Sequence, residues 1–194
     1  MSSHFRIEDA YPEEPISVAQ TEERNGVAID RVFGSVAVGP FNYQVVTRGD
    51  FRTVIHLKNF TTSQLGLLAL AIRDFDQQAV GLGFAKSRGM GNVSIKVEDI
   101  TFHYPAAETA GGRIASLAGA DYGSESQVLG AGHMLSGSGY DYISDDLVNA
   151  AVTTSEDAYG YGVVQRISVP DHVHDLWRGC VSKWRQEAER GVHT

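Results

Sequence analysis

The sequence predicts an α+β fold in which antiparallel strands and a helix alternate along the first half of the chain. Residues 41–47 and 51–57 are rich in β-prone side chains and flank a short turn, which predicts an antiparallel hairpin. Residues 61–76 repeat apolar side chains at helical spacing, and residues 92–104 alternate apolar with polar side chains as a half-buried strand does. A chain of 194 residues can bury one such core, or one domain with an appendage.

The helix has the clearest local signals. Thr61 supplies an N-cap hydroxyl and Gln64 follows three residues later, which is the pattern of a capping box. We expect the helix to end at Asp76 and its apolar stripe to pack against the hairpin over residues 51–57. The stripe comprises Leu65, Leu68, Ala69, Ile72 and Phe75.

The strands on either side of this helix suggest a particular topology. A short strand is expected over residues 79–84, and the strand over residues 92–104 changes its apolar phase near residues 98–99, which predicts a bulge. The order strand, strand, helix, strand is the second half of a ferredoxin-like, or RRM-like, unit. The first strand and helix of such a unit have no counterpart upstream, so we expect residues beyond 105 or another subunit to complete the sheet.

A glycine-rich loop over residues 81–91 is the candidate functional motif. Its four glycines leave backbone amides uncovered, and Lys86, Ser87 and Arg88 between them can each hold a phosphate. The loop has neither the Gly-Lys-Ser/Thr of a P-loop nor a Gly-x-Gly-x-x-Gly motif before a helix, so no nucleotide cofactor is expected. Two interpretations stay open: a turn in which Gly89 and Gly91 only supply positive φ angles, and a site for a polyanion.

The charge distribution favours a local contact over general nucleic-acid binding. The net charge is −8, which opposes non-specific binding to a polyanion. Residues 41–100, however, carry 7 Lys and Arg against 5 Asp and Glu, whereas residues 101–194 carry 6 against 12. The glycine-rich loop lies in this basic third, so we expect an electropositive strip on an acidic body.

The composition also predicts a cytoplasmic protein without a membrane segment. The longest apolar stretch, residues 65–72, is far too short to cross a bilayer, and the N-terminal residues lack the apolar core of a signal peptide. The one cysteine, Cys180, cannot form an internal disulfide and falls on the apolar face of a predicted helix, which favours a buried thiol.

The remaining segments complete a division into three parts. Residues 1–104 are assigned to the partial ferredoxin-like domain, with residues 8–26 as an extended, mobile arm. Residues 105–145 are rich in glycine and serine and predict a long loop or insertion. Residues 146–194 predict a strand near residues 162–169 and then an amphipathic helix, which completes the domain or docks on a neighbour. The apolar stripe of that helix comprises Val173, Leu176, Trp177, Cys180, Val181 and Trp184.

Three motifs in the first half of the chain carry a resemblance to a known family. They are Ala28-Ile29-Asp30-Arg31, the Val-x-x-Gly-x-Phe step at Val46, Gly49 and Phe51, and the Lys-Ser-Arg-Gly-Met-Gly loop over residues 86–91. In this order and roughly this spacing they resemble the RAMP superfamily of CRISPR-associated proteins, whose ferredoxin-like subunits build type III effector complexes. The resemblance covers about residues 5–104.

The resemblance implies a guide-RNA-binding structural subunit of a ribonucleoprotein for antiviral defence. Its expected partners are guide RNA, target RNA and other CRISPR effector subunits. Lys86 is then a point charge on phosphate, Ser87 with the amides of Gly89 and Gly91 donates hydrogen bonds, and Arg88 is a bidentate clamp. Arg31 either contacts RNA or pairs structurally with Asp30.

The alternative is a metal-dependent endoribonuclease subunit that cuts target RNA paired to the guide, with Mg²⁺ as its cofactor. In cutting members of the family the catalytic aspartate lies in an N-terminal portion that this sequence does not match, so the resemblance favours the structural role, without a cofactor. The candidate acids are Asp9, Asp30 and the Asp145-Asp146 pair, and all are expected to be solvated surface groups.

Other residue types give weaker signals of chemistry. His172 and His174 are two apart, which places their side chains on divergent directions of a helix and not around one metal ion. His103 and His133 are isolated in the sequence, and Ser136 and Ser138 lie in a stretch without a nucleophile elbow.

Overall fold

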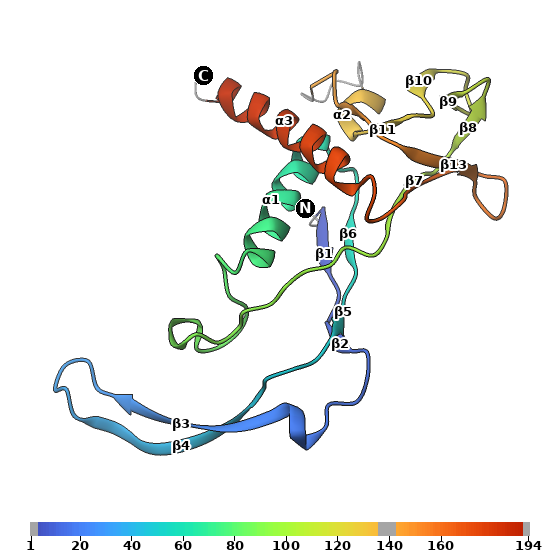
Figure 1. Cartoon of the computed structure of the whole chain (residues 1–194). Coiled ribbons are helices and arrows are strands. Elements are labelled where there is room, and N and C mark those ends of the chain that lie inside the picture. The colour runs from blue at the N-terminus through green and yellow to red at the C-terminus, as the bar shows by residue number, and fades with distance from the viewer. Residues whose placement is uncertain (1–3, 136–142, 192–194) are drawn as a thin grey trace. The chain divides into compact units, whose positions relative to one another are not determined.

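The computed structural model describes residues 4–135 and 143–191 (Figure 1). The chain divides into two compact units between Lys58 and Asn59. Helices and strands both occur, and every strand pairing among the described residues is antiparallel. The α+β class is therefore confirmed, with several small antiparallel sheets in place of one large sheet. The boundary between the units does not coincide with the divisions at residues 104 and 145.

The first unit is a set of three two-stranded antiparallel ribbons. Strand β1 (Phe5–Ile7) pairs with β6 (Ile55–Leu57), and β2 (Tyr11–Pro12) pairs with β5 (Phe51–Arg52). A one-turn 3-10 helix, η1 (Val18–Gln20), leads into the long hairpin of β3 (Thr21–Ile29) and β4 (Val36–Val46). Among the residues whose burial is described, Gly26 alone is buried in this unit, so these ribbons enclose almost no core.

The predicted hairpin between residues 41–47 and 51–57 is wrong. Strand β4 pairs with β3, the strand that precedes it in the chain. The register places Thr21 opposite Val46 and Gly26 opposite Phe41. At Gly26 a Cβ atom would lie 2.6 Å from the ring of Phe41, so the glycine makes room for the aromatic side chain across the ladder. The β-prone pattern identified strand within residues 41–47 and 51–57 but not β3, and pattern alone does not say which strand pairs with which.

The expected arm over residues 8–26 is also largely structured. It contains β2, η1 and the first six residues of β3. The Glu- and Pro-rich composition concealed these elements because exposed ribbons need few apolar residues. The capping box at η1, in which Ser17 and Gln20 bond to each other's backbone, closes the turn before β3.

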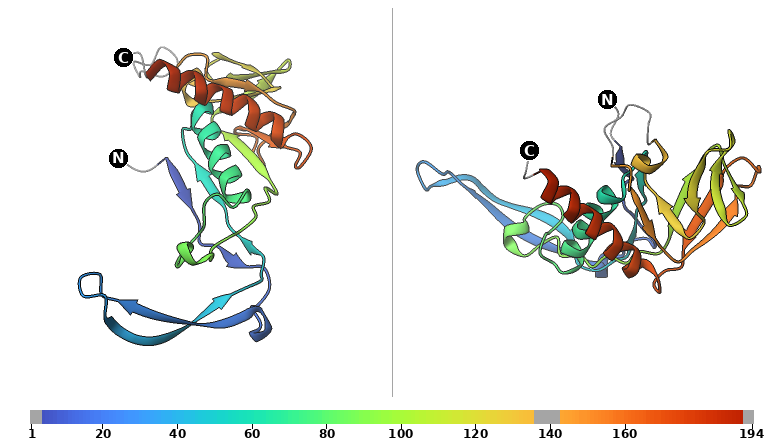
Figure 2. Two further views of the ribbon diagram at one scale, coloured as in Figure 1. Left: turned by 60° about the vertical axis from the view of Figure 1, so that its left-hand side comes forward. Right: turned by 90° about the horizontal axis from the view of Figure 1, so that it is seen from above.

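The second unit holds the helices and the core. Helix α1 (Thr62–Asp76) packs along helix α3 (Val173–Gly191), and Gly66 marks their closest approach, since a Cβ atom there would lie 2.2 Å from the carbonyl oxygen of Cys180 (Figure 2). Thr61 is the N-cap of α1 and forms the predicted capping box with Gln64. The helix and both of its ends are therefore as predicted.

Three small sheets and a short helix accompany these two helices. One sheet has the order β13–β14–β7, the next β10–β9–β8, and the third pairs β11 with β12. The elements are β7 (Ile100–Tyr104), β8 (Ala107–Ala110), β9 (Arg113–Ser116), β10 (Asp121–Ser124), β11 (Gln127–Leu129), α2 (Ala131–Met134), β12 (Leu147–Asn149), β13 (Val152–Glu156) and β14 (Val163–Ile167).

Side chains from both helices and all three sheets form the core. Leu176 and Cys180 of α3 are fully buried, as the predicted amphipathic stripe requires. Strand β14 is the central strand of its sheet and reproduces the strand predicted near residues 162–169. The other buried apolar side chains include Leu65, Ala69, Phe102, Tyr104, Ile114, Val128, Leu129, Val163 and Ile167.

The prediction of a long loop over residues 105–145 is wrong for the described part of that segment. Four short strands and α2 occupy much of it, and tight turns join the strands. Gly111, Gly112 and Gly119 have φ angles of 59°, 79° and 81°, which is the left-handed conformation that such turns require. Strands of three or four residues are too short to show apolar periodicity, so the glycines dominated the pattern. Residues 136–142, which include Ser136 and Ser138, lie outside the described residues.

Two predicted strands next to the glycine-rich loop do not form. Residues 79–84 have no strand, and the strand expected from residue 92 begins only at Ile100, so no bulge forms at residues 98–99. Residues 92–97 do alternate between exposed and half-buried side chains. Among the described residues no strand pairs with them; instead the Ile95 N–H donates to Oδ1 of Asp76, 3.1 Å away, at the end of α1.

Candidate functional site

The glycine-rich loop is a closed, well-defined turn. Its centre is a 3-10 turn, η2 (Lys86–Arg88), flanked by Ala85 and Gly89, which are both left-handed with φ angles of 58° and 78°. At its base the Leu82 N–H donates to the carbonyl oxygen of Gly91, with 2.9 Å between the two atoms. Gly91 has a φ angle of +81°, and a Cβ atom there would lie 1.9 Å from the Leu82 carbonyl oxygen, so only glycine can close the loop.

The three phosphate-binding candidates are all exposed on this turn. Lys86, Ser87 and Arg88 are exposed, and no ion pair of Lys86 occurs among the residues that the structure describes. The aliphatic stem of Lys86 passes near Gly81, where a Cβ atom would lie 3.3 Å from its Cγ. The loop thus presents cationic and hydroxyl groups to solvent, which is an arrangement that can hold an anion.

The backbone amides of the loop contribute less than the sequence predicts. The Gly89 N–H donates to the carbonyl oxygen of Lys86 at 3.1 Å, and the Arg88 N–H donates to that of Ala85 at 2.9 Å. These two donors are engaged inside the loop by the i→i+3 hydrogen bonds of the 3-10 turn. The Gly89 amide, which is predicted to donate to a phosphate, is therefore engaged inside the loop in this structure, and Gly91 accepts a hydrogen bond there through its carbonyl oxygen.

Arg31 lies at the tip of the β3–β4 hairpin in the first unit and is exposed. The neighbouring carboxylate of Asp30 is used by the turn itself: its Oδ1 accepts hydrogen bonds from the N–H groups of Val32 and Phe33, each 2.8 Å away. No ion pair between Asp30 and Arg31 occurs in the described part of the chain. Of the two interpretations of Arg31, structural pairing with Asp30 is therefore not the one observed.

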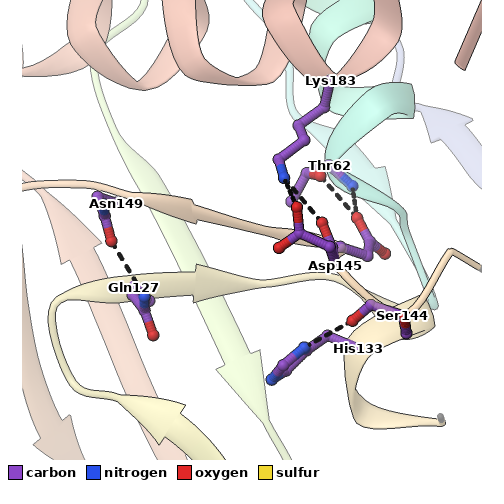
Figure 3. Close-up of polar contacts among 8 residues, drawn as sticks. Thr62, Gln127, His133, Ser144, Asp145, Asn149 and Lys183 are labelled. Carbon is purple, nitrogen blue, oxygen red and sulfur yellow. Dashed lines mark hydrogen bonds and ion pairs between the residues drawn. The ribbon is translucent and has the colours of Figure 1, made fainter. Parts of the chain in front are cut away.

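The paired acids Asp145 and Asp146 have structural roles (Figure 3). Asp146 is only 4% exposed, so the expectation of a solvated acid is wrong for this residue. Its Oδ1 accepts from the Thr62 N–H at 2.7 Å and from the Thr62 hydroxyl at 2.6 Å, while Oδ2 accepts from the Gly132 N–H at 2.9 Å. The carboxylate thereby satisfies free donors at the start of α1, where negative charge is also favoured by the helix dipole.

Asp145 is exposed and pairs with α3. Its Oδ2 lies 2.7 Å from Nζ of Lys183, and the same ammonium donates to the Asp145 carbonyl oxygen at 2.8 Å (Figure 3). Together, Asp145 and Asp146 join the segment before β12 to helix α1 and to helix α3. No signal in the sequence distinguished this pair from surface acids, because the donors that they meet lie far away along the chain.

The histidines that the structure describes do not form a metal site. Nδ1 of His133 lies 2.8 Å from the Ser144 carbonyl oxygen and Nε2 lies 2.7 Å from that of Tyr122, so this side chain links α2 to two other segments. His174 is exposed on α3. Within residues 4–135 and 143–191, no group of three His, Cys, Asp or Glu side chains is placed to hold one metal ion.

One feature of the loop was missed by sequence reasoning. The ring of Phe84 is 64% exposed, and the guanidinium carbon of Arg88 lies 6.0 Å from the ring centroid. The only signal for it in the sequence was an aromatic residue inside a glycine-rich, cationic loop, where no core position explains it.

Comparison with known proteins gives one family. Residues 1–94 match the model of the RAMP superfamily, and this segment includes the hairpin tip with Arg31 and the whole glycine-rich loop. No curated protein and no solved structure matches the chain. In the described residues no helix has the length and apolar content needed to span a bilayer. The match over the first 94 residues therefore supports a CRISPR-associated protein of the RAMP superfamily.

Proposed function

We propose that this chain is a guide-RNA-binding structural subunit of a type III CRISPR effector ribonucleoprotein, which acts in the cytoplasm in antiviral defence. In this proposal the residues up to 104 belong to a partial ferredoxin-like RAMP domain, and other effector subunits flank it along the guide and its paired target RNA. The observation that carries the proposal is the exposed Lys86-Ser87-Arg88 turn, which projects from a loop closed by glycines.

The electrostatics of the chain support a local phosphate contact. With a net charge of −8, the protein as a whole repels a polyanion, so any attraction must come from a site where cations are not neutralised by the chain's own acids. Several other cations are neutralised in this way: Arg73 by Asp74, Arg113 by Asp121 and Arg178 by Asp175. Lys86 has no such partner among the described residues, and its ammonium is therefore available to an RNA phosphate.

The proposal is tested by the double substitution Lys86→Ala and Arg88→Ala. Removing each charged group is expected to weaken RNA binding about tenfold, because a hydrogen bond to a charged group contributes about 1.5–3 kcal/mol. The slope of log affinity against log salt is expected to become shallower by about 0.7 for each phosphate of single-stranded RNA that the variant no longer neutralises. Both quantities are measured by fluorescence anisotropy with a labelled guide RNA over a series of salt concentrations.

The matched control also removes two positive charges from the second unit of the protein, as the loop variant does. Arg178 and Arg185 are each 80% exposed on α3 and pair with acids one helical turn away, Asp175 and Glu189. Arg178→Ala with Arg185→Ala should leave both the affinity and its salt slope close to wild type. If the loop variant behaves like this control, the loop does not bind RNA and the proposed function is wrong.

A further inference from the structure

Phe84 occupies an unusual place for a large apolar side chain. It lies within the glycine-rich loop, two residues before Lys86, and is 64% exposed. Burying a phenylalanine side chain is worth about 1.5–3 kcal/mol, so an exposed ring forgoes that stabilisation in the free protein.

The guanidinium group of Arg88 accompanies this ring. Its central carbon lies 6.0 Å from the ring centroid, within the range of a cation–π contact. A flat aromatic ring next to a flat guanidinium group offers two surfaces of the kind on which nucleobases stack. The remaining exposure of the ring leaves room for a base beside this pair.

The backbone holds these groups in a fixed relation to the cationic turn. Gly83 and Ala85, on either side of Phe84, both have positive φ angles, of 72° and 58°. The Arg88 N–H donates to the Ala85 carbonyl oxygen, so the residue carrying the guanidinium is tied to the residue after Phe84. One short segment therefore presents an aromatic ring for a base and an ammonium for a phosphate.

We propose that Phe84 and Arg88 form a stacking platform for an unpaired nucleobase, so that the loop binds single-stranded RNA through base and backbone together. This inference rests on the proposed function and narrows its ligand to RNA with at least one base unstacked. In a duplex the faces of the bases are covered by their neighbours, so the platform has nothing to stack on.

The experiment compares two single-stranded RNAs with the same phosphates. One is a short oligouridylate, and the other has the same length with abasic sites at its centre. The wild-type protein is expected to bind the first about tenfold more tightly, since stacking one base on an aromatic side chain contributes about one to two orders of magnitude in affinity. Phe84→Leu should abolish that preference, because leucine is apolar but has no ring face, and Phe84→Trp should keep it.

Lys86→Ala provides the matched comparison. It should weaken binding to both RNAs by the same factor and leave the preference for base-containing RNA unchanged, because it removes a phosphate contact alone. Phe84→Leu should conversely leave the salt slope unchanged. A 2-aminopurine base at the centre of the RNA gives a second readout, since its fluorescence is quenched when it stacks.

The outcomes separate this inference from the proposed function. If Phe84→Leu retains the wild-type preference, or lowers the affinity for both RNAs by the same factor, the stacking inference is wrong. This holds even where Lys86→Ala still lowers the affinity. If the wild-type protein binds both RNAs equally, the inference is also wrong. If Lys86→Ala with Arg88→Ala has no effect on either RNA, the proposed function itself fails.

Discussion

At the scale of single residues, burial determines the chemistry of the only cysteine. Cys180 is fully buried on α3, and this burial, together with the nearby negative charge of Asp146, raises the pKa of its thiol from 9.0 to about 12. At neutral pH the thiolate fraction is therefore about a thousandfold smaller than for an ordinary thiol. The prediction of a buried thiol from its helical stripe is confirmed.

This shift has a measurable dependence on pH. The unfolded chain releases the thiol proton first, so the contribution to stability is complete below pH 9 and declines as the pH rises toward 12. We expect the free energy of unfolding to fall across this interval, and Cys180→Ala to make the decline shallower. Urea unfolding at several pH values measures this, and equal slopes in the two proteins would contradict it.

At the scale of elements, α1 depends on its N-terminal cap. The Thr61 hydroxyl accepts from the Gln64 N–H, and the Gln64 side chain accepts from the Thr61 N–H. Thr61→Ala should lower the free energy of unfolding by about 1 kcal/mol, whereas Thr61→Ser keeps the hydroxyl and should cost much less. Chemical denaturation measures both variants. Indistinguishable stabilities would mean that the Asp146 carboxylate alone is sufficient at this helix end.

The same helix shows which elements a sequence can specify. Its cap, stripe and end are local signals within one segment, as is the apolar stripe of α3, which explains why both helices were predicted. The bonds of Asp146 to Thr62 join residues that lie 84 positions apart in the chain, and the pairing of β4 depends on which neighbouring strand it takes as its partner. No local pattern carries that information, so these features were missed.

The candidate site likewise has features that the sequence predicts and features that depend on the folded structure. Residues 86–88 were identified because glycine, lysine and arginine in one loop are informative by themselves. The engaged amide of Gly89 was not foreseeable, since it depends on the 3-10 geometry of the turn. The contact of Arg88 with Phe84 likewise depends on how the loop folds back on itself.

At the scale of the whole molecule, the two units differ in how many side chains they bury. The large buried side chains of the described residues all lie in residues 59–194. Two-stranded ribbons are marginally stable by themselves, whereas a central strand with both neighbours is protected. We therefore expect amides of the β3–β4 hairpin to exchange with solvent much faster than those of β14.

Hydrogen exchange followed by mass spectrometry tests this difference in the intact protein. Amides at the centre of β14, such as those of Val164 and Gln165, should be among the slowest to exchange, since both edges of this strand are paired. Similar protection in the hairpin and in β14 would show that the first unit draws stability from contacts other than its own ribbons.

The scarcity of buried residues in the first unit also determines how its sequence can change. Apart from Gly26, which faces the ring of Phe41, most side chains there are exposed, so enlarging or truncating them opens no large void and causes little steric clash. Changes of size that would be disruptive around Leu176 are tolerated by the ribbons as far as folding is concerned. Constraint on exposed residues such as Arg31 then does not come from packing in the protein's own interior.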